Sequence, residues 1–454
     1  MDDILQRFVQ NAPIAVMARA GLARVFAAPA LNELFERHAQ AQYTRELTFS
    51  TLVRLMVQVA FGTHDSVHAA YRHTPDLPVS VQAVYDKLDR LETGISEGLV
   101  HDSATAMGTI LDALPFPPPA GAPAGLRLRT LDGNYLAGTD HRLAALRGCG
   151  AAALPGMALV VRDGRTGLLT DLVACADAYT NERSLAARVL ALVGPDELWL
   201  ADRNFCTEDY LGGIAQRRAF FLVRHHAGTH LEALAPERPA GTNPSGDLSE
   251  QKVRAGEVRC RCITVRLHRP LRDGSTEVRL LTNVPANKAG AKRLAEVYRT
   301  RWQIETAFQE LTVYLRCEVS TLGYPKAALF AFALAVTAYD LLVVVKAALA
   351  SGQGRARVEQ ELSTYHLATE VAVYGEGMAV AVPAGAWQEL AALPTAAFAR
   401  WLHEVARGLD WKRYRKNPRK PKKPAAVQRT SRGAHRSTAR VLQEKSHRKA
   451  PSKG

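Results

Sequence analysis

The order of strands and helices predicted between residues 126 and 223 constrains the fold of this chain more than any other feature. The strands predicted from short apolar runs are Leu126–Leu136, Gly156–Arg162, Leu168–Ala176, Glu197–Ala201 and Ala219–Val223. An Asp-Gly pair predicts a hairpin between the second and third strands. Helices are predicted on both sides of the fourth strand, the first of them capped by Asn181. Three consecutive strands followed by alternating helices and strands indicate a layered α/β or α+β core.

The regions before and after this core differ from it in pattern. Residues 1–115 show apolar residues at helical spacing and predict an all-α N-terminal domain. A proline-rich run, 115–123, cannot continue a helix and predicts a linker. Residues 124–350 form the predicted catalytic domain, in which 225–287 has the pattern of a β-rich insertion. A long helix over 289–315 follows this insertion.

Most of the net positive charge lies at the C-terminal end. The chain has 58 Lys/Arg and 44 Asp/Glu, yet residues 411–454 alone hold 16 Lys/Arg and a single acid. After a predicted α/β extension at 351–410, this segment is predicted to be a basic, disordered tail that binds a polyanion. We expect its removal to lower the affinity for a polyanion such as DNA, and the salt dependence of that binding, without affecting a site elsewhere in the chain. The candidate DNA contacts at its start are Lys412, Arg413, Arg415 and Lys416.

Cysteine spacing and hydropathy argue against several protein classes. The six cysteines match neither a disulfide scaffold nor the spacing of a zinc site. The N-terminal sequence does not resemble a signal peptide. The apolar stretch 327–350 is interrupted by Asp340 and Lys346 and predicts a buried core helix rather than a membrane span. We therefore predict a cytoplasmic protein without a membrane partner.

Three acids lie at positions from which a sheet and an adjacent helix could bring their side chains together. Asp132 lies in the first predicted strand, Asp202 directly follows the fourth, and Glu305 lies on the long helix. Carboxylates are the preferred ligands of hard divalent cations. Two such cations can activate a water or hydroxyl and stabilise the leaving oxygen of a phosphodiester. The joint order of the three acids therefore predicts a metal-dependent phosphodiester site.

Each acid also has an ordinary structural explanation. Asp132, followed by Gly133, could be a turn residue, and Asp202 could cap the next helix. Glu305 could form a helix ion pair with Arg301, which lies one turn earlier. Individually these signals are weak, and only their combination favours a common site.

The predicted helix carries three further candidate residues beside Glu305. Tyr298, Arg301 and Trp302 lie along the same stripe at 3.6 residues per turn. Arg301 suits a bidentate phosphate contact, and a tyrosine hydroxyl can hydrogen-bond a phosphate. These three residues are the candidate DNA contacts of the catalytic domain.

The chain resembles bacterial insertion-sequence transposases of the DDE type, specifically the insertion sequence four family with its Tyr-Arg-Glu-Lys signature. The matching stretches are Leu131–Gly133, Ala201–Phe205 and Tyr298–Phe308, and the resemblance spans roughly residues 45–350. The Tyr-x2-Arg-x3-Glu spacing is met in the last stretch. Thr312 stands where the signature has Lys, so Arg316 or Lys326 would have to supply that charge.

The resemblance implies a ribonuclease H-like mixed sheet flanked by helices, with a β-rich insertion before the helix that carries Glu305. It implies that Asp132, Asp202 and Glu305 bind two Mg²⁺ per active site, with Mn²⁺ as a substitute. It also implies that Tyr298 and Arg301 hold a phosphate of the transposon end.

The implied function is DNA transposition, with two-metal hydrolysis at the element ends followed by strand transfer into target DNA. The implied partners are double-stranded DNA, both as terminal inverted repeats and as target, and a second copy in a homodimer on DNA. Region 1–115 would help recognise the ends, and the protein would be associated with the bacterial nucleoid when bound to DNA. The alternatives are a ribonuclease H-like nuclease without strand transfer and a catalytically inactive DNA-binding descendant.

Overall fold

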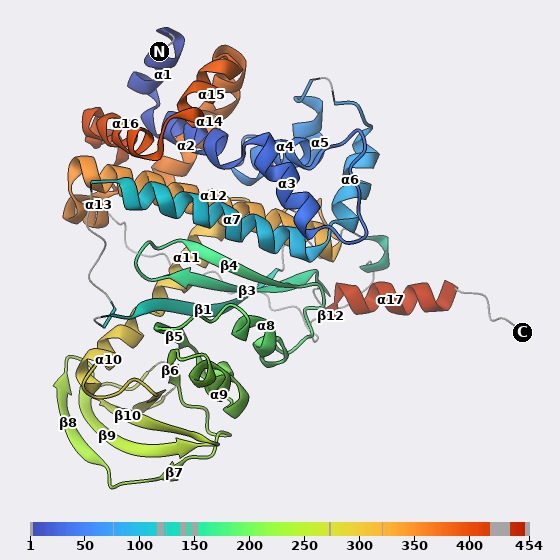
Figure 1. The fold of residues 1–454 in the computed structure, drawn as a ribbon. Coiled ribbons are helices and arrows are strands. Elements are labelled where there is room, and N and C mark those ends of the chain that lie inside the picture. The colour runs from blue at the N-terminus through green and yellow to red at the C-terminus, as the bar shows by residue number, and fades with distance from the viewer. Residues whose placement is uncertain are drawn as a thin grey trace, which may run out of the picture.

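The computed structural model describes residues 3–75, 77–115, 122–123, 125–136, 143–146, 153–271, 274–319, 321–417 and 436–449 (Figure 1). The α-helices in these ranges are α1 (Asp3–Asn11), α2 (Pro13–Val25), α3 (Ala28–His38), α4 (Phe49–Ala60), α5 (Val67–Arg72), α6 (Val81–Arg90), α7 (Thr93–Ala113), α8 (Ala186–Leu190), α9 (Glu208–Gln216), α10 (Ala291–Arg299), α11 (Trp302–Tyr314), α12 (Pro325–Gln353), α13 (Arg355–Glu361), α14 (Thr364–Ala381), α15 (Ala384–Ala392), α16 (Thr395–Gly408) and α17 (Thr438–Lys449). The strands are β1 (Arg127–Leu136), β2 (Ala153–Leu154), β3 (Gly156–Asp163), β4 (Leu169–Cys175), β5 (Glu197–Ala201), β6 (Phe220–Arg224), β7 (Glu232–Ala233), β8 (Arg238–Asn243), β9 (Gly246–Ala255), β10 (Val258–Leu267), β11 (Glu277–Thr282) and β12 (Arg436–Ser437). Short 3-10 helices are η1 (Ala144–Leu146), η2 (Glu182–Leu185), η3 (Arg203–Phe205) and η4 (Trp411–Tyr414).

One continuous mixed sheet organises the centre of the molecule. Its strand order is β4-β3-β1-β5-β6-β11-β10-β9-β7, and β8 also pairs with β9. The β4-β3-β1 pairs are antiparallel, whereas β1, β5 and β6 are parallel. Three antiparallel strands followed by two parallel ones form a ribonuclease H-like sheet, which confirms the predicted fold class. Strands β7 to β11 extend the same sheet and form the predicted β-rich insertion.

Helices cover both faces of the sheet because its central strands are apolar on both sides (Figure 1). Ala158 and Val160 of β3 lie in a hydrophobic core shared with α7 and α12. Met157, Leu159 and Val161 lie in a second core with α8 and α9. Successive side chains of a strand point to opposite faces, so β3 contributes to both cores.

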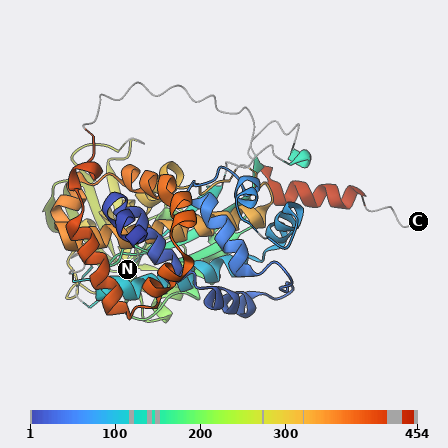
Figure 2. The same ribbon diagram turned by 90° about the horizontal axis from the view of Figure 1, so that it is seen from above.

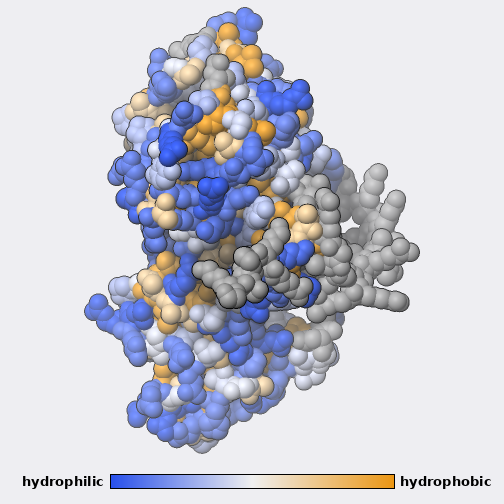
Figure 3. Space-filling view, turned by 90° about the vertical axis from the view of Figure 1, so that its right-hand side faces the viewer, coloured by the Kyte–Doolittle hydropathy of each residue, from blue (hydrophilic) through white to orange (hydrophobic). Residues whose placement is uncertain are grey.

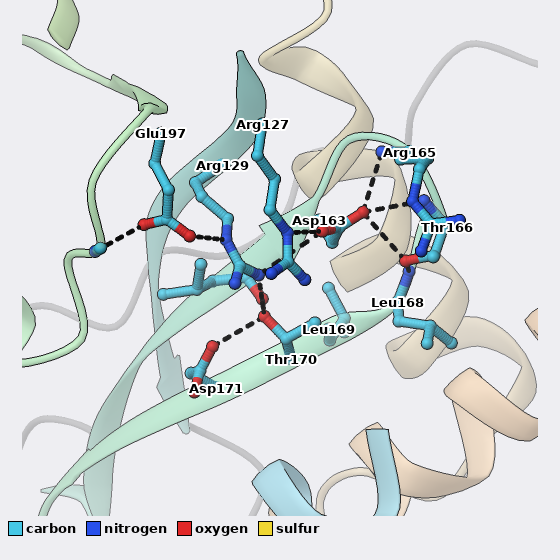
Figure 4. Close-up of polar contacts among 12 residues, drawn as sticks. Arg127, Arg129, Asp163, Arg165, Thr166, Leu168, Leu169, Thr170, Asp171 and Glu197 are labelled. Carbon is cyan, nitrogen blue, oxygen red and sulfur yellow. Dashed lines mark hydrogen bonds and ion pairs between the residues drawn. The ribbon is translucent and has the colours of Figure 1, made fainter. Parts of the chain in front are cut away.

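Polar contacts at the start of β1 fix its register against its neighbours (Figure 4). Arg129 Nε donates to Glu197 Oε1 on β5 at 2.8 Å, and Arg127 Nε donates to Asp163 Oδ2 at the end of β3, also at 2.8 Å. Arg129 Nη1 donates to Thr170 Oγ1 of β4 at 2.9 Å. A shift by one residue would move these side chains to the opposite face, so the contacts favour the observed register.

Helix α12 lies in the interior, as predicted for the most apolar stretch. It is long and apolar enough to cross a membrane, but 94% of its most apolar 18-residue window is buried inside the protein. Asp340 Oδ1 accepts a hydrogen bond from the Leu169 backbone N–H at 2.8 Å, and Lys346 pairs with Glu310 of α11 at 2.7 Å. Both charged residues therefore have partners inside the protein. The face of the molecule in Figure 3 is mostly hydrophilic, with separate smaller hydrophobic areas.

The N-terminal helices α1 to α7 share their cores with the rest of the chain. Phe330 of α12 packs in one core with helices α3 to α6, and Phe332 packs in another with α2 and α7. Glu370 of α14 accepts hydrogen bonds from the backbone N–H groups of Ile14 and Ala15 at the start of α2. In Figure 2 the N-terminal helix therefore lies among the C-terminal helices. The helical prediction for 1–115 is confirmed for its described residues, whereas DNA binding by this region stays a prediction.

The predictions for the C-terminal part need correction. Residues 351–410 form helices α13 to α16, and the described structure has no strand there. Trp411 and Tyr414, at the start of the predicted disordered tail, are buried, and Trp411 Nε1 donates to Glu361 Oε2 at 2.8 Å. Farther along, β12 pairs with β2, and α17 projects from the body (Figures 1 and 2). Residues 418–435 and 450–454 lie outside the described part.

The helix predicted over 289–315 is two helices, α10 and α11, with a break at Thr300 and Arg301. At the break, the Thr300 hydroxyl donates to the Val297 carbonyl at 2.7 Å, and the Arg301 N–H bonds to the Tyr298 carbonyl. Hydrogen bonds between residues three apart wind the backbone more tightly than those of an α-helix. The apolar residues on either side of the break keep their helical spacing. Arg301 consequently precedes the helix that carries Glu305.

Candidate active site

Asp132 and Asp202 occupy matching positions on adjacent parallel strands. The last residues paired between β1 and β5 are Thr130 and Leu200, and each Asp lies two residues farther along the chain. Neighbouring strands are about 4.8 Å apart, so the two acids project from adjacent parts of the backbone. Residues two apart on a strand point to the same face of a sheet. Because Thr130 pairs with Leu200, Asp132 and Asp202 are therefore directed to the same face.

Local hydrogen bonds orient both side chains. Asp132 Oδ1 accepts from the Gly133 N–H at 3.0 Å, and Asp202 Oδ1 accepts from the Asn204 N–H at 2.8 Å. The second contact makes Asp202 the N-cap of η3. Asp202 therefore does cap the following helical turn, and this hydrogen bond holds its side chain at the end of β5.

Arg301 brings Glu305 and Asp132 together. Its Nη1 donates to Asp132 Oδ2 at 2.9 Å, and its Nη2 donates to Glu305 Oε1 at 2.6 Å. The residue is only 8% exposed, so these ion pairs lie largely away from solvent. Arg301 was predicted to contact a DNA phosphate, and in this structure its guanidinium instead holds two of the three candidate catalytic acids.

The environment of Asp132 raises the pKa of its carboxyl. Burial raises the pKa of Asp132 to about 6, although Arg301 and the Gly133 N–H oppose this rise. The Asp202 and Glu305 carboxylates also raise it, because neighbouring negative charges disfavour ionisation. A cation placed among them would favour the ionised form.

Tyr298 and Trp302 differ in their availability to DNA. The Tyr298 hydroxyl donates to the Ala201 carbonyl at 3.3 Å, directly before Asp202, and burial raises its pKa to about 12. Trp302 is 60% exposed, and the Arg301 guanidinium lies 5.1 Å from the centre of its ring. Tyr298 thus packs against the site, while Trp302 presents an aromatic surface beside it.

Thr312, at the position of the signature Lys, is exposed, and its hydroxyl donates to the Phe308 carbonyl within α11. Of the two cations considered as replacements, Arg316 pairs with Asp65 at 2.5 Å, and Lys326 is exposed at the start of α12. The structure does not bring either residue to Asp132 or Glu305 in a described contact.

The basic residues after Trp411 lie on the surface near α13 and α14. Arg415 pairs with Glu361 at 3.2 Å, Arg413 approaches Glu370 at 3.8 Å, and Lys416 donates to two backbone carbonyls of α13. Lys412 is exposed. Lys416 also lines a groove of about 1130 Å³, and Gln303 and Thr306 of α11 are among its other lining residues. These candidates are therefore separate from the three acids, although the groove reaches the flank of the same helix.

The donors at the site suit a hard divalent cation, because all of them are carboxylate oxygens. Among the described residues, no three His, Cys, Asp or Glu side chains form a preassembled metal site. The Arg301 guanidinium lies between Asp132 and Glu305 and supplies the positive charge that a metal ion would bring to these two carboxylates. Metal binding by the three acids stays a prediction, and it would require the carboxylates to close on the cation.

Two polar residues beside the site were not predicted. Glu182, the first residue of η2, accepts a hydrogen bond at its Oε2 from Asn204 Nδ2 at 3.2 Å. Burial and the Asp202 carboxylate raise the pKa of Glu182, while the Asn204 hydrogen bond lowers it. The sequence predicted Asn181 as a helix cap, and Glu182 follows it in the first turn. Because acids are common in the first turn of a helix, Glu182 was not predicted to belong to a site.

Comparison with known proteins addresses the chain's family. Residues 147–341 match the transposase DDE domain family. This match supports a DDE transposase. It includes Asp202 and Glu305 and begins after Asp132, so it covers two of the three acids. The finer assignment to the insertion sequence four family is not part of this match.

A solved structure similar to this chain is the cryo-EM structure of a piggyBac transposase synaptic complex with hairpin DNA. The identity is 12%, the TM-score is 0.41, and the similarity covers 90% of this chain and 87% of the other. No curated protein sequence matches this chain.

Proposed function

We propose that this protein is the transposase of a bacterial insertion sequence of the insertion sequence four family. It would cut a phosphodiester at each element end and join the freed 3′ hydroxyl to target DNA. The observation that carries the proposal is the matching position of Asp132 and Asp202 on the adjacent parallel strands β1 and β5, with Glu305 joined to Asp132 through Arg301. Two of these acids lie in the stretch that matches the transposase DDE domain.

Asp132, Asp202 and Glu305 would hold Mg²⁺, with Mn²⁺ as a substitute. When bound, the cations supply activation of the attacking oxygen and stabilisation of the leaving oxygen. Arg301 contacts one oxygen each of Asp132 and Glu305, so it offsets their repulsion in the metal-free protein. Bound cations would take over that role and free the guanidinium for the bidentate phosphate contact expected of it.

The partners in this proposal are the terminal repeats and target DNA. Exposed Trp302, the basic residues 412–416 and the N-terminal helices would contact DNA. A homodimer would bring two ends together, and the protein would act in the bacterial cytoplasm at the nucleoid.

A cleavage assay with the full chain tests the proposal. End-containing DNA is incubated with Mg²⁺, and the wild type is compared with Asp132→Asn and Glu305→Gln. We expect both variants to lose cleavage by at least about 100-fold. Asp112→Asn, at an exposed acid of α7 that pairs with Arg165, is the matched control and should cleave like the wild type.

The products distinguish the alternatives. Joined target DNA supports transposition, whereas cleavage alone would assign a nuclease without strand transfer. Cleavage that survives Asp132→Asn and Glu305→Gln would contradict the site, and no cleavage by the wild type would favour the inactive DNA-binding descendant.

A further inference from the structure

The groove lined by Lys416 is formed by several parts of the fold. Its walls come from α11, the hairpin that joins β3 to β4, the C-terminal half of α12, and helices α13 and α14. Thr300, Gln303 and Thr306 are among its lining residues, and Arg301 and Glu305 lie between them in the sequence. The groove therefore adjoins the helical segment that carries part of the proposed active site.

Positive charge exceeds negative charge among the residues that line the groove. Five of them are Lys or Arg, and three are Asp or Glu. Arg165, Lys346 and Arg355 each pair with one of these three acids. Lys416 instead donates to two backbone carbonyls of α13, at 3.1 and 3.3 Å, so its charge has no acidic partner among the described residues. The fifth cation is Arg162.

Arg162 lacks a counter-ion of its own. Its Nε is buried and has no hydrogen-bond partner in the described part of the chain. Burial lowers the pKa of Arg162, whereas the charges of Tyr339, Asp163 and Asp340 oppose this shift. Asp163 already forms ion pairs with two arginines of β1, and burial raises the pKa of Asp340, which weakens it as a counter-charge. An anion in the groove would supply the missing negative charge.

Aromatic side chains line the same groove. They are Tyr314, Tyr365 and His366. Tyr365 is 56% exposed, and its ring meets those of Tyr314 and His366 at interplanar angles of 62° and 67°. Because neither neighbouring ring lies parallel to that of Tyr365, neither one stacks on it. Tyr365 therefore offers ring surface to a planar group in the groove.

Cations beside an exposed aromatic ring suit a single strand of nucleic acid. Its phosphates pair with Lys and Arg, and its unpaired bases stack on aromatic side chains. In a duplex the bases stack on one another, so a duplex would use the cations and leave Tyr365 without a partner. The combination of charge and ring in one groove therefore favours a strand with unpaired bases.

We propose that this groove binds a single-stranded segment of DNA, with phosphates at Arg162 and Lys416 and a base stacked on Tyr365. This inference rests on the proposed function, because cutting at an element end would free a strand next to α11. It adds a binding surface for that strand to the three acids identified in the sequence.

Fluorescence anisotropy in EDTA tests the inference without using cleavage. The full chain is titrated into a fluorescein-labelled oligothymidylate of about 12 nucleotides, which does not pair with itself and lies within the usual range of site sizes. We expect Tyr365→Ala to lower the affinity about 10-fold, the typical effect of losing one stacked base. Tyr365→Phe keeps the ring and should bind like the wild type. Equal affinity of Tyr365→Ala and the wild type would overturn the inference.

Tyr324→Ala is the matched control. Tyr324 is also an exposed tyrosine next to the start of a helix, α12, but it is not among the lining residues of the groove. Its variant should bind the oligothymidylate like the wild type, and a loss as large as that of Tyr365→Ala would contradict a specific site. If Tyr365→Ala weakened binding of an oligothymidylate–oligoadenylate duplex equally, the choice of a single strand would be wrong.

The salt dependence of binding tests the phosphate contacts. Arg162→Gln and Lys416→Gln should each reduce the slope of log affinity against log salt by about 0.7, the value for one phosphate of a single strand. Lys416 is exposed, so its variant keeps the test valid even if Arg162→Gln does not fold. Lys292→Gln, at an exposed lysine of α10 outside the groove, should leave the slope unchanged. An unchanged slope in Lys416→Gln would contradict its phosphate contact.

Cleavage of end-containing DNA in Mg²⁺ separates this inference from the proposed function. A wild type that cleaves, together with unchanged oligothymidylate binding in Tyr365→Ala, would reject the inference alone. A wild type that does not cleave, although Tyr365→Ala weakens binding as expected, would reject the proposed function and retain the groove as a site for single strands.

Discussion

Arg301 donates a hydrogen bond of 2.9 Å to the carboxylate of Asp132, a residue 169 positions earlier in the chain. Because the same guanidinium also pairs with Glu305, its removal would leave two acids close together without a counter-charge. We predict that Arg301→Ala lowers the free energy of unfolding by roughly 3 kcal/mol in EDTA, as expected when one partner of a buried ion pair is lost. Urea unfolding measures this effect.

Arg165→Ala is the control for this prediction, since Arg165 forms an exposed ion pair with Asp112. Its loss should cost less than about 1 kcal/mol. Saturating Mn²⁺ should recover part of the stability of Arg301→Ala, because the cation would replace the guanidinium. Equal losses in the two variants would show that Arg301 does not hold the acids together.

Asp340 predicts a specific pH dependence of stability. It is fully buried on α12, and its Oδ2 has no hydrogen-bond partner among the described residues. Burial raises the pKa of Asp340 well above its usual range, although the Leu169 N–H and Arg162 oppose the rise. The folded state therefore holds this proton more tightly than the unfolded state.

The resulting stabilisation is fully present below about pH 4, where the unfolded carboxyl is also protonated. It is lost as the pH rises through the raised pKa of the folded protein. Asp340→Asn keeps an acceptor for Leu169 and does not titrate, so its stability relative to the wild type should increase with pH. Urea unfolding of both proteins at several pH values from 4 to 8 measures this difference, and a constant difference would refute it.

Tyr414 predicts a stability effect far from the candidate active site. Its hydroxyl donates to Glu370 Oε2 at 2.7 Å, and both residues are buried. Tyr414→Phe would deprive this carboxylate of a donor and should cost about 1–3 kcal/mol in unfolding free energy. Tyr365→Phe, at a residue of α14 that is 56% exposed, should have little effect and serves as the control.

The position of Tyr414 also determines where the basic segment can be removed. A deletion from Trp411 would destabilise the fold, whereas truncation after Asn417 leaves buried Trp411 and Tyr414 in place and removes 12 Lys/Arg together with β12 and α17. We predict that the truncated protein binds DNA with a smaller salt dependence, because fewer phosphates lose their counterions. Metal-dependent cleavage of end-containing DNA should persist, and an unchanged salt slope would show that the basic residues after Asn417 do not contact phosphates.

The sequence patterns predicted the central sheet because each of its strands is a short apolar run with a recognisable boundary. Thr207 caps α9, and Asn181 opens the preceding helical turn, as capping residues do elsewhere. Strand β8 was missed because its residues, Arg238–Asn243, are mostly exposed and include Pro and Gly. It pairs only with β9, a peripheral position that tolerates proline.

The candidate site could be predicted only in part. Helical spacing correctly placed Arg301 next to Glu305, but it could not show that Asp132 lies within reach of the same guanidinium. That contact depends on the register of β1 and on the break at Thr300, which leaves no mark on the apolar pattern. Glu182 was missed because its proximity to Gly133 exists only once the connection between β4 and β5 has folded.

Glu370 receives hydrogen bonds both from the first turn of α2 and from Tyr414. The beginning of the protein is therefore completed by a segment that the ribosome makes much later. During synthesis, the start of α2 lacks these hydrogen bonds until Glu370 has left the exit tunnel, and Glu370 lacks the Tyr414 hydroxyl until later still. The N-terminal helices therefore reach their final contacts only after the central sheet and its β-rich insertion have been made.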